Sequence, residues 1–127
     1  MPRTTASKVV VVDDDYGVVL LVETQLEHAG FDVITCLDPL DALARCEAGD
    51  IDVMVSDWMM PGFTGLELLE VLQQKQPQVA RVLLTAAPQE PEVRQALASG
   101  LVEYLIAKPW GRSELVSAVR AACADRP

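Results

Sequence analysis

The hydrophobic residues of this chain occur in two kinds of segment that alternate along it. The first kind is a short run of valine, isoleucine and leucine with few polar interruptions. Such runs are typical of parallel strands that are covered on both faces. They predict five strands, at residues 9–12, 33–34, 51–55, 82–84 and 102–106.

The second kind of segment carries apolar residues three or four positions apart, which is typical of a helix with one buried face. Asp38 before Pro39, and Ser113 later in the chain, are predicted helix starts, while Gly30 and Gly100 are predicted helix ends. The stripes that we expect to be buried are Val18, Leu21, Val22, Gln25, Leu26 and Ala29; Leu40, Leu43 and Ala44; Leu66, Leu68, Leu69 and Leu72; Val93, Ala96 and Leu97; and Leu115, Val116, Val119 and Ala122.

Five strand–helix units with short connections predict an α/β fold, a five-stranded parallel sheet wound in both directions with helices on both faces. The length of 127 residues suits one domain. We expect the core of this domain to span about residues 8–123, with a frayed N-terminal tail before it.

The charge balance disfavours several classes of partner. Ten Lys and Arg residues stand against 19 Asp and Glu residues, for a net charge of −9. Direct binding to nucleic acid or to an anionic membrane surface is therefore not expected. No apolar run approaches the ~18–20 residues that span a bilayer, and the N-terminus lacks a signal-peptide pattern. Three cysteines without a C-x-x-C pair, beside a single His28, favour reduced thiols in a cytoplasmic protein over a zinc site.

Chemically reactive side chains follow four of the predicted strands. Residues 13–15 are three aspartates after the first strand, Asp57 follows the third, Thr85 the fourth and Lys108 the fifth. Ligands of open α/β sheets bind outside the carboxyl ends of the strands, so we expect these groups to meet there. Any one of these aspartates could be an ordinary solvated loop residue, but the whole set favours a site.

An oxygen-only cluster of this kind suits Mg²⁺, which offsets the repulsion between neighbouring carboxylates. No glycine-rich loop follows the first strand, which disfavours a dinucleotide or flavin site. The aspartates at residues 13–15 would repel a bare phosphate. A phosphoryl group is therefore expected here only together with a metal ion.

These stretches resemble the receiver domains of two-component response regulators, over about residues 8–123. The resemblance rests on Val-Val-Asp-Asp-Asp at 11–15, Val-Ser-Asp-Trp-Met-Met-Pro-Gly-Phe-Thr-Gly at 55–65, Leu-Thr-Ala at 84–86 and Ala-Lys-Pro-Trp at 107–110. It implies the chemotaxis-type receiver fold, with the flavodoxin-like strand order 2-1-3-4-5.

The resemblance also implies a role for each reactive residue. Asp57 matches the carboxylate that accepts a phosphoryl group from a histidine kinase or a phosphorelay partner. Thr85 matches the hydroxyl that hydrogen-bonds this group, and Lys108 the ammonium that pairs with it. An ionised carboxylate is a competent acceptor without a general base.

The metal site is implied in the same way. Asp14 and Asp57 match the side chains that hold Mg²⁺, Asp13 assists through water, and Met59 contributes its backbone carbonyl. No further cofactor is expected.

The implied function is a phosphorylation-controlled signalling switch, without enzymatic activity apart from Mg²⁺-dependent self-phosphorylation and autodephosphorylation at Asp57. The implied partners are a histidine kinase or phosphotransfer protein, and an output domain or second copy on the face of the fourth helix, fifth strand and fifth helix. A phosphohydrolase with an aspartyl-phosphate intermediate is an alternative, although it generally needs a second Asp where Met59 stands. A receiver-like module that is never phosphorylated is another.

One spacing departs from the pattern expected of the family. Lys108 lies 23 residues after Thr85, one more than expected, and we place the extra residue near Gly100 in a loop. Many receivers carry a switching aromatic three residues before the strand-end lysine, where this chain has Leu105. Neighbouring strand residues point to opposite faces, so we expect Tyr104 to turn away from the switch position towards the surface or a partner.

Overall fold

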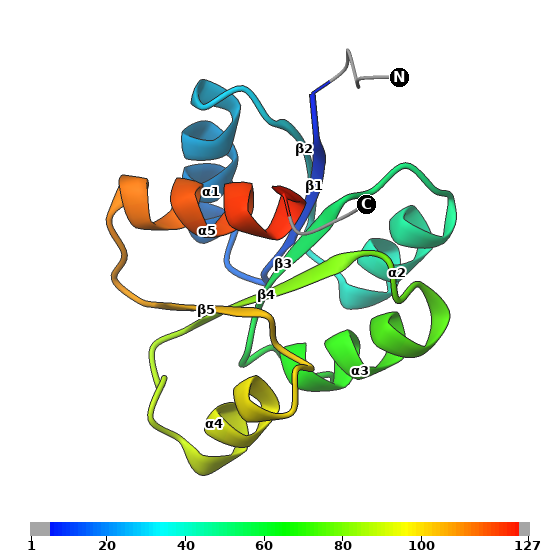
Figure 1. The fold of residues 1–127 in the computed structure, drawn as a ribbon, viewed down its shortest axis with the longest axis vertical. Coiled ribbons are helices and arrows are strands. Elements are labelled where there is room, and N and C mark those ends of the chain that lie inside the picture. Colours follow the sequence, from blue (N-terminus) through cyan, green and yellow to red (C-terminus); the bar gives the residue numbers. More distant parts are fainter. Residues whose placement is uncertain (1–5, 125–127) are drawn as a thin grey trace.

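A computed structural model describes residues 6–124. The expected N-terminal tail falls mainly on residues 1–5, which lie outside the described part, as do residues 125–127. Strands and helices alternate from β1 to α5 (Figure 1). The elements are β1 (Lys8–Val12), α1 (Tyr16–His28), β2 (Asp32–Cys36), α2 (Pro39–Glu47), β3 (Val53–Asp57), α3 (Gly65–Lys75), β4 (Ala80–Thr85), α4 (Pro91–Ala98), β5 (Tyr104–Ala107) and α5 (Arg112–Ala124).

The five strands form one parallel sheet in the order β2-β1-β3-β4-β5, which confirms the expected order. At its end, β1 pairs Val12 with Cys36 on one side and with Ser56 on the other. β1 therefore has β2 on one side and β3 on the other, and the direction in which successive strands are added reverses beside β1. The loops after β1 and β3 diverge at this point, where open sheets of this class bind ligands.

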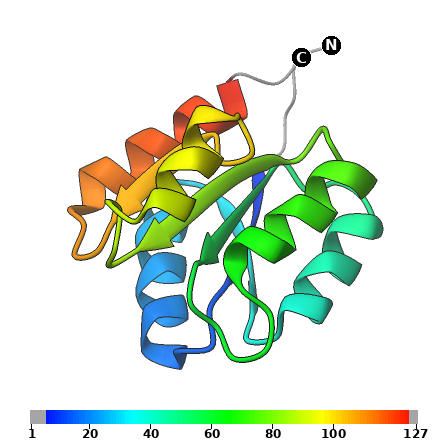
Figure 2. The same ribbon diagram turned by 90° about the horizontal axis from the view of Figure 1, so that it is seen from below.

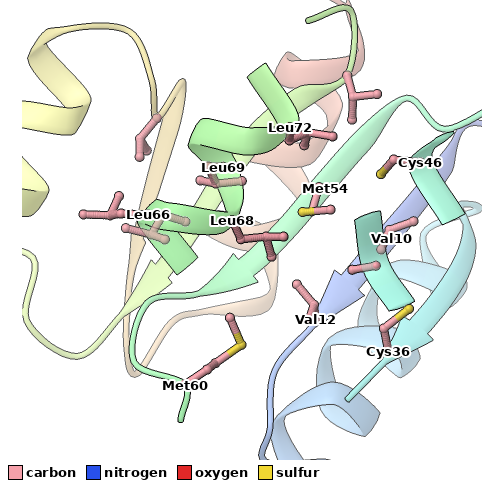
Figure 3. Packing of buried hydrophobic residues seen from close by; sticks show 14 of the residues in the cluster. Val10, Val12, Cys36, Cys46, Met54, Met60, Leu66, Leu68, Leu69 and Leu72 are labelled. Atoms are coloured by element: carbon pink, nitrogen blue, oxygen red, sulfur yellow. The ribbon is translucent and has the colours of Figure 1, made fainter. Parts of the chain in front are cut away.

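Alternate residues of the strands pack into two separate cores. Val9 and Val11 face the α1–α5 core, between the sheet and helices α1 and α5. Val10 and Val12 face the α2–α4 core, between the sheet and helices α2, α3 and α4. Figures 1 and 2 show α1 and α3 on opposite sides of the sheet. The leucines of α3 close the α2–α4 core over Met54 (Figure 3).

Helix α1 buries a stripe that partly differs from the predicted one. Val19, Val22 and Leu26 are buried, whereas Leu21 is 48% exposed. The prediction is right for Val22 and Leu26 and wrong for Leu21. The first half of α1 is apolar on more than one side, so spacing alone did not distinguish its buried face.

Helix α2 buries a different face from the one predicted. Ala42 and Cys46, four residues apart, are buried, whereas Leu40 is 66% exposed and Ala44 is exposed. The prediction of a Leu40–Leu43–Ala44 stripe is therefore wrong, and only Leu43 packs partly against the core. Two adjacent apolar stripes run along this short helix, and its packing against the sheet and α3 decides which of them is buried.

Several element ends also differ from the prediction. β3 begins at Val53 and β5 at Tyr104, two residues later than expected in each case. The N–H of Val102 donates to the carbonyl of Ala96 at the end of α4, so Val102 belongs to the loop. Helix α5 begins at Arg112, so Ser113 lies inside the helix and is not its cap.

The other predicted helix ends are confirmed. The Asp38 side chain accepts the N–H of Leu40 at 2.9 Å, directly before Pro39. Gly30 and Gly100, after α1 and α4, have φ angles of +100° and +86°. Residues with side chains rarely adopt such angles, which explains glycine at these positions.

The three cysteines are free thiols, as expected, and Cys36 and Cys46 are buried. Burial raises the pKa of Cys46 to about 12, so that this thiol stays protonated at neutral pH. Within residues 6–124, the longest and most apolar helix still falls short of what crossing a membrane requires.

Candidate functional site

The neighbouring strands β1 and β3 bring Asp13 and Asp57 together at their carboxyl ends. Asp57 is the last residue of β3, and Asp13 directly follows β1 beside it. Only 1% of Asp13 and 7% of Asp57 is exposed. Two carboxylates buried side by side repel each other, which raises the pKa of at least one of them unless a cation lies close to both.

Lys108 supplies that cation. Its Nζ lies 2.6 Å from Oδ1 of Asp57 and 3.4 Å from Oδ2 of Asp13. The backbone N–H of Lys108 donates to the carbonyl of Thr85 at 2.8 Å, which extends the β4–β5 pairing by one residue. The lysine thus lies directly after the end of β5, and its side chain extends past the end of β4 to the carboxylates.

The electrostatics of the site follow from this burial. Burial raises the pKa of Asp13 from 3.8 to about 6; the hydrogen bond from the Asp15 N–H opposes this rise, and the charge of Asp57 adds to it. Burial lowers the pKa of Lys108, but its hydrogen bond with Asp57 and the charge of Asp13 outweigh burial and raise that pKa. Lys108 is therefore a cation at neutral pH.

The acidic residues also form a candidate metal site. Asp13, Asp14 and Asp57 each offer a carboxylate oxygen, and these oxygens lie within 4.8 Å of one another. Asp14 is exposed, so water can complete a coordination shell on its side. Hard oxygen ligands together with several waters match the preference of Mg²⁺. The cluster can therefore bind a divalent cation of this kind.

Thr85 is buried at the end of β4, and its Oγ1 accepts the N–H of Ala87 at 2.9 Å. This bond leaves the hydroxyl hydrogen available to a ligand. Within residues 6–124, no side-chain hydrogen bond joins Thr85 to Asp57 or Lys108. Asp13, Asp57 and Lys108 are therefore in contact with one another through the lysine. Thr85 lies at the end of the neighbouring strand β4, without a hydrogen bond to them.

Met59 and Trp58 follow Asp57 in the loop before α3. The Met59 side chain is 63% exposed, and the role of its carbonyl as a metal ligand stays a prediction. Trp58 packs partly against the α2–α4 core. Its buried Nε1 has no hydrogen-bond partner among residues 6–124.

The strand that leads to Lys108 is regular. Four successive residues of β5 pair with four of β4, from Tyr104 beside Val82 to Ala107 beside Thr85. Any extra residue therefore lies outside these pairs. Leu105 packs against the α2–α4 core and Tyr104 against the α1–α5 core, which confirms that they face opposite sides. Tyr104 is half-buried, however, and not a surface ring.

Two features of the site were not predicted. A Cβ atom on Gly65, at the start of α3, would overlap the carbonyl oxygen of Asp57, so this position is confined to glycine. The glycine at the end of the 55–65 stretch was visible in the sequence, but its close approach to β3 was not. The second feature is a hydrogen bond between Trp110 and Gln25, whose partners lie 85 residues apart.

Comparison with known proteins places this geometry in a family. The model of the response regulator receiver domain matches residues 9–120. The chain is 36% identical over 117 residues to the phosphate regulon transcriptional regulatory protein PhoB of Rhizobium meliloti, covering 90% of the chain and 51% of that protein. It is 34% identical over 125 residues to the cyclic di-GMP phosphodiesterase response regulator RpfG of Xanthomonas campestris pv. campestris, covering 92% of the chain and 31% of that protein.

Solved structures agree with these relatives. The receiver domain of the Francisella response regulator 1452 superposes with a TM-score of 0.84 at 30% identity, covering 93% of this chain and 97% of the other. The chemotaxis protein CheY4 of Vibrio cholerae, crystallized at low pH, superposes with a TM-score of 0.84 at 27% identity, covering 93% and 99%. The chain thus matches these structures over nearly their whole length, but spans about half or less of the two curated relatives.

The matched residues include both buried carboxylates, the lysine that joins them and all of the five-stranded sheet except Lys8, the first residue of β1. RpfG and the Francisella protein are both called response regulators, and the Francisella structure is that of a receiver domain. This chain therefore belongs to the receiver domain family of response regulators, the phosphorylation-controlled switches of two-component signalling.

Proposed function

We propose that Asp57 accepts a phosphoryl group from a histidine kinase or phosphotransfer protein, in the presence of Mg²⁺, and that this modification changes a partner-binding face. The observation that carries the proposal is the contact of Lys108 with both Asp57 and Asp13, at 2.6 and 3.4 Å. A half-buried cation between two buried carboxylates is suited to neutralising the charge of a phosphoryl group.

The transfer needs positioning and charge neutralisation more than acid–base chemistry. An oxygen of Asp57 forms a bond to phosphorus, and the bond from phosphorus to the donor nitrogen breaks, leaving its electron pair on the donor. Lys108 then pairs with an oxygen of the transferred group, and Thr85 donates its hydroxyl hydrogen to another. Thr85 is the last residue of β4, and Lys108 directly follows β5.

The metal would be held by Asp14 and Asp57, by Asp13 through water, and by the carbonyl of Met59. When bound, Mg²⁺ neutralises charge between the acceptor and the donor phosphate and orients the oxygens. The carboxylates of this chain supply the matching hard ligands, at mutual distances within 4.8 Å.

The two other hypotheses have less support. A phosphohydrolase of this kind needs an acid near the leaving group, and the exposed thioether of Met59 cannot donate a proton. A module that is never phosphorylated would have no need of the buried Asp13–Lys108–Asp57 arrangement, which leaves a carboxylate with a raised pKa in the fold.

We infer a single receiver domain with its core at about residues 8–123, acting in the cytoplasm. The kinase or phosphotransfer partner meets the site, and an output domain or a second copy meets the face of α4, β5 and α5. Mg²⁺-dependent self-phosphorylation from small phosphodonors and autodephosphorylation belong to the same proposal.

The direct test incubates the purified chain with acetyl phosphate and Mg²⁺. We expect one phosphoryl group per chain, labile to base and to hydroxylamine, and mapped by peptide mass spectrometry to the segment that contains Asp57. A chelator in place of Mg²⁺ should prevent the modification. Labelling on a serine or threonine, or turnover of a generic phosphate ester, would contradict the proposal.

Removing single carboxylates should weaken Mg²⁺ binding unequally. Asp14→Ala should weaken it more than Asp13→Ala, because both oxygens of Asp13 already accept hydrogen bonds, from the Asp15 N–H and from Lys108. Isothermal titration in the absence of phosphate measures the two affinities. If both variants bind like the parent, the metal site lies elsewhere.

The pKa of Asp13 predicts how stability depends on pH in metal-free protein. Because this pKa rises from 3.8 to about 6 on folding, the folded state binds the extra proton more tightly. The resulting stabilisation is complete below pH 3.8 and is lost as the pH rises through 6. Between pH 7 and pH 5 the free energy of unfolding should gain about 1 kcal/mol from this group.

Urea denaturation with a chelator present, at several pH values, measures this gain. Asp13→Asn should remove about 1 kcal/mol from the difference between pH 5 and pH 7, since the amide does not titrate. An identical pH dependence in the variant would exclude Asp13 as its source.

Thr85→Ala should separate phosphorylation from response. The variant keeps Asp57, Lys108 and the carboxylates, so acetyl phosphate should still label it. It loses the hydroxyl next to the loop that leads to α4, so phosphorylation should no longer alter the face of α4, β5 and α5. Backbone NMR shifts with and without phosphodonor report both effects. A response equal to that of the parent would remove Thr85 from the switch.

A further inference from the structure

Trp110 makes a hydrogen bond that the proposed phosphoryl chemistry does not explain. Its indole Nε1 donates to Oε1 of Gln25 in α1 at 2.8 Å. The ring is half-buried and packs against the α1–α5 core. The indole therefore joins the loop between β5 and α5 to the side of α1.

The composition of this loop makes Trp110 its anchor. The loop between Lys108 and Arg112 is Pro109-Trp110-Gly111, in which proline has no N–H and glycine has no side chain. Trp110 is thus the one loop residue whose side chain can form a hydrogen bond. Across residues 6–124, its bond to Gln25 is the side-chain hydrogen bond that ties residues 108–111 to α1.

Both ends of this link lead to the charged site. Lys108 lies two residues before Trp110, and its ammonium contacts Asp57 and Asp13. At the other end, α1 begins where the aspartate loop ends: Asp15 caps the helix by accepting the N–H of Gly17 at 2.9 Å. The link therefore connects the element that carries the cation with the element that follows the carboxylates.

A lysine side chain needs such support more than most groups. Its four-carbon stem is flexible, and holding the ammonium at one point costs side-chain entropy. The backbone of Lys108 is held on one side by the carbonyl of Thr85. The anchored indole limits the path of the chain on the other side, and so limits where the lysine stem can point.

We propose that Gln25 and Trp110 are a positioning pair for phosphoryl transfer to Asp57, acting through the loop that carries Lys108. This inference rests on the proposed function of Asp57. Neither residue touches the reacting atoms, so neither is a catalytic residue. Their hydrogen bond sets how well the ammonium is aligned, whereas metal binding depends on the carboxylates of other loops.

The test measures two quantities on the purified chain: the maximal rate of labelling by acetyl phosphate, and the Mg²⁺ concentration that half-saturates metal binding without a phosphodonor. Trp110→Phe removes the indole N–H, and Gln25→Met removes the acceptor at similar length. Each should lower the maximal rate about threefold to tenfold, the range expected for one hydrogen bond, with metal affinity no weaker than that of the parent.

Further variants separate positioning from general damage. The double variant should be no slower than the slower single variant, because both substitutions break the same bond. Gln25→Glu keeps an acceptor oxygen for the indole N–H and should therefore be labelled at close to the parental rate. Thr24→Ala is the matched control: it removes an exposed hydroxyl that bonds only within α1, to the carbonyl of Leu20. This control should label at the parental rate.

The outcomes distinguish this inference from the proposed function. If the parent chain accepts no phosphoryl group on Asp57, the proposed function fails. If the parent is labelled but both single variants are labelled as fast as the parent, the positioning role of Gln25 and Trp110 is wrong. It is also wrong if the two losses of rate multiply in the double variant. A loss of Mg²⁺ affinity equal to the loss of rate would also overturn it.

Discussion

Asp57→Asn is expected to abolish the base-labile phosphoryl group that acetyl phosphate adds with Mg²⁺. The substitution keeps the shape of the side chain but replaces the anionic oxygen that attacks phosphorus. It also replaces the strongest partner of Lys108, now 2.6 Å away, with a neutral amide. The nearby Asp13 is already engaged by the Asp15 N–H and does not lie at the end of β3, so it is not expected to substitute.

Labelling of the variant, measured by intact-mass spectrometry, should fall to background. Asp32→Asn is the matched control, because Asp32 is exposed at the opposite end of the sheet, at the start of β2. It should be labelled like the parent. Circular dichroism should show that both variants keep the fold. Equal labelling of the Asp57→Asn variant would place the phosphoryl group on another residue.

Gly65→Ala should produce the largest loss of stability. The added Cβ would overlap the carbonyl oxygen of Asp57, and this obstacle is backbone that cannot rotate away. Gly65 is also held there by its N–H, which donates to the carbonyl of Trp58 at 2.7 Å. The start of α3 and the end of β3 must therefore move apart. We expect a loss of about 3 kcal/mol in the free energy of unfolding.

Urea denaturation at fixed pH measures this loss, and Gly111→Ala is its control. A Cβ on Gly111 would meet no atom within 4 Å, so that variant should unfold within about 0.5 kcal/mol of the parent. Because the overlap is with Asp57 itself, Gly65→Ala should also slow labelling by acetyl phosphate. A variant as stable as the parent would show that α3 can shift without disturbing β3.

The sequence by itself determined the order of the elements and the edge at which the chemistry lies. Runs of valine and leucine between helical stripes require a parallel sheet, because each helix returns the chain to the same end of the sheet. Parallel strands end at one edge, so the residues after them converge wherever the strands pair. The meeting of Asp13, Asp57 and Lys108 therefore follows from their positions in the sequence.

The tertiary structure decided the features that depend on contacts between residues far apart in the sequence. α2 carries two apolar stripes, and only packing against the sheet and α3 selected Ala42 and Cys46 over Leu40. The pKa of Asp13 depends on how deeply its carboxylate is buried, which local sequence does not specify.

Two contacts join elements that periodicity does not predict to be neighbours. One is the close approach of Gly65 to Asp57, and the other is the hydrogen bond from Trp110 to Gln25. Periodicity reports which face of an element is apolar, because that pattern is local. It does not report which atoms of another element meet that face, and these contacts depend on how the helices settle on the twisted sheet.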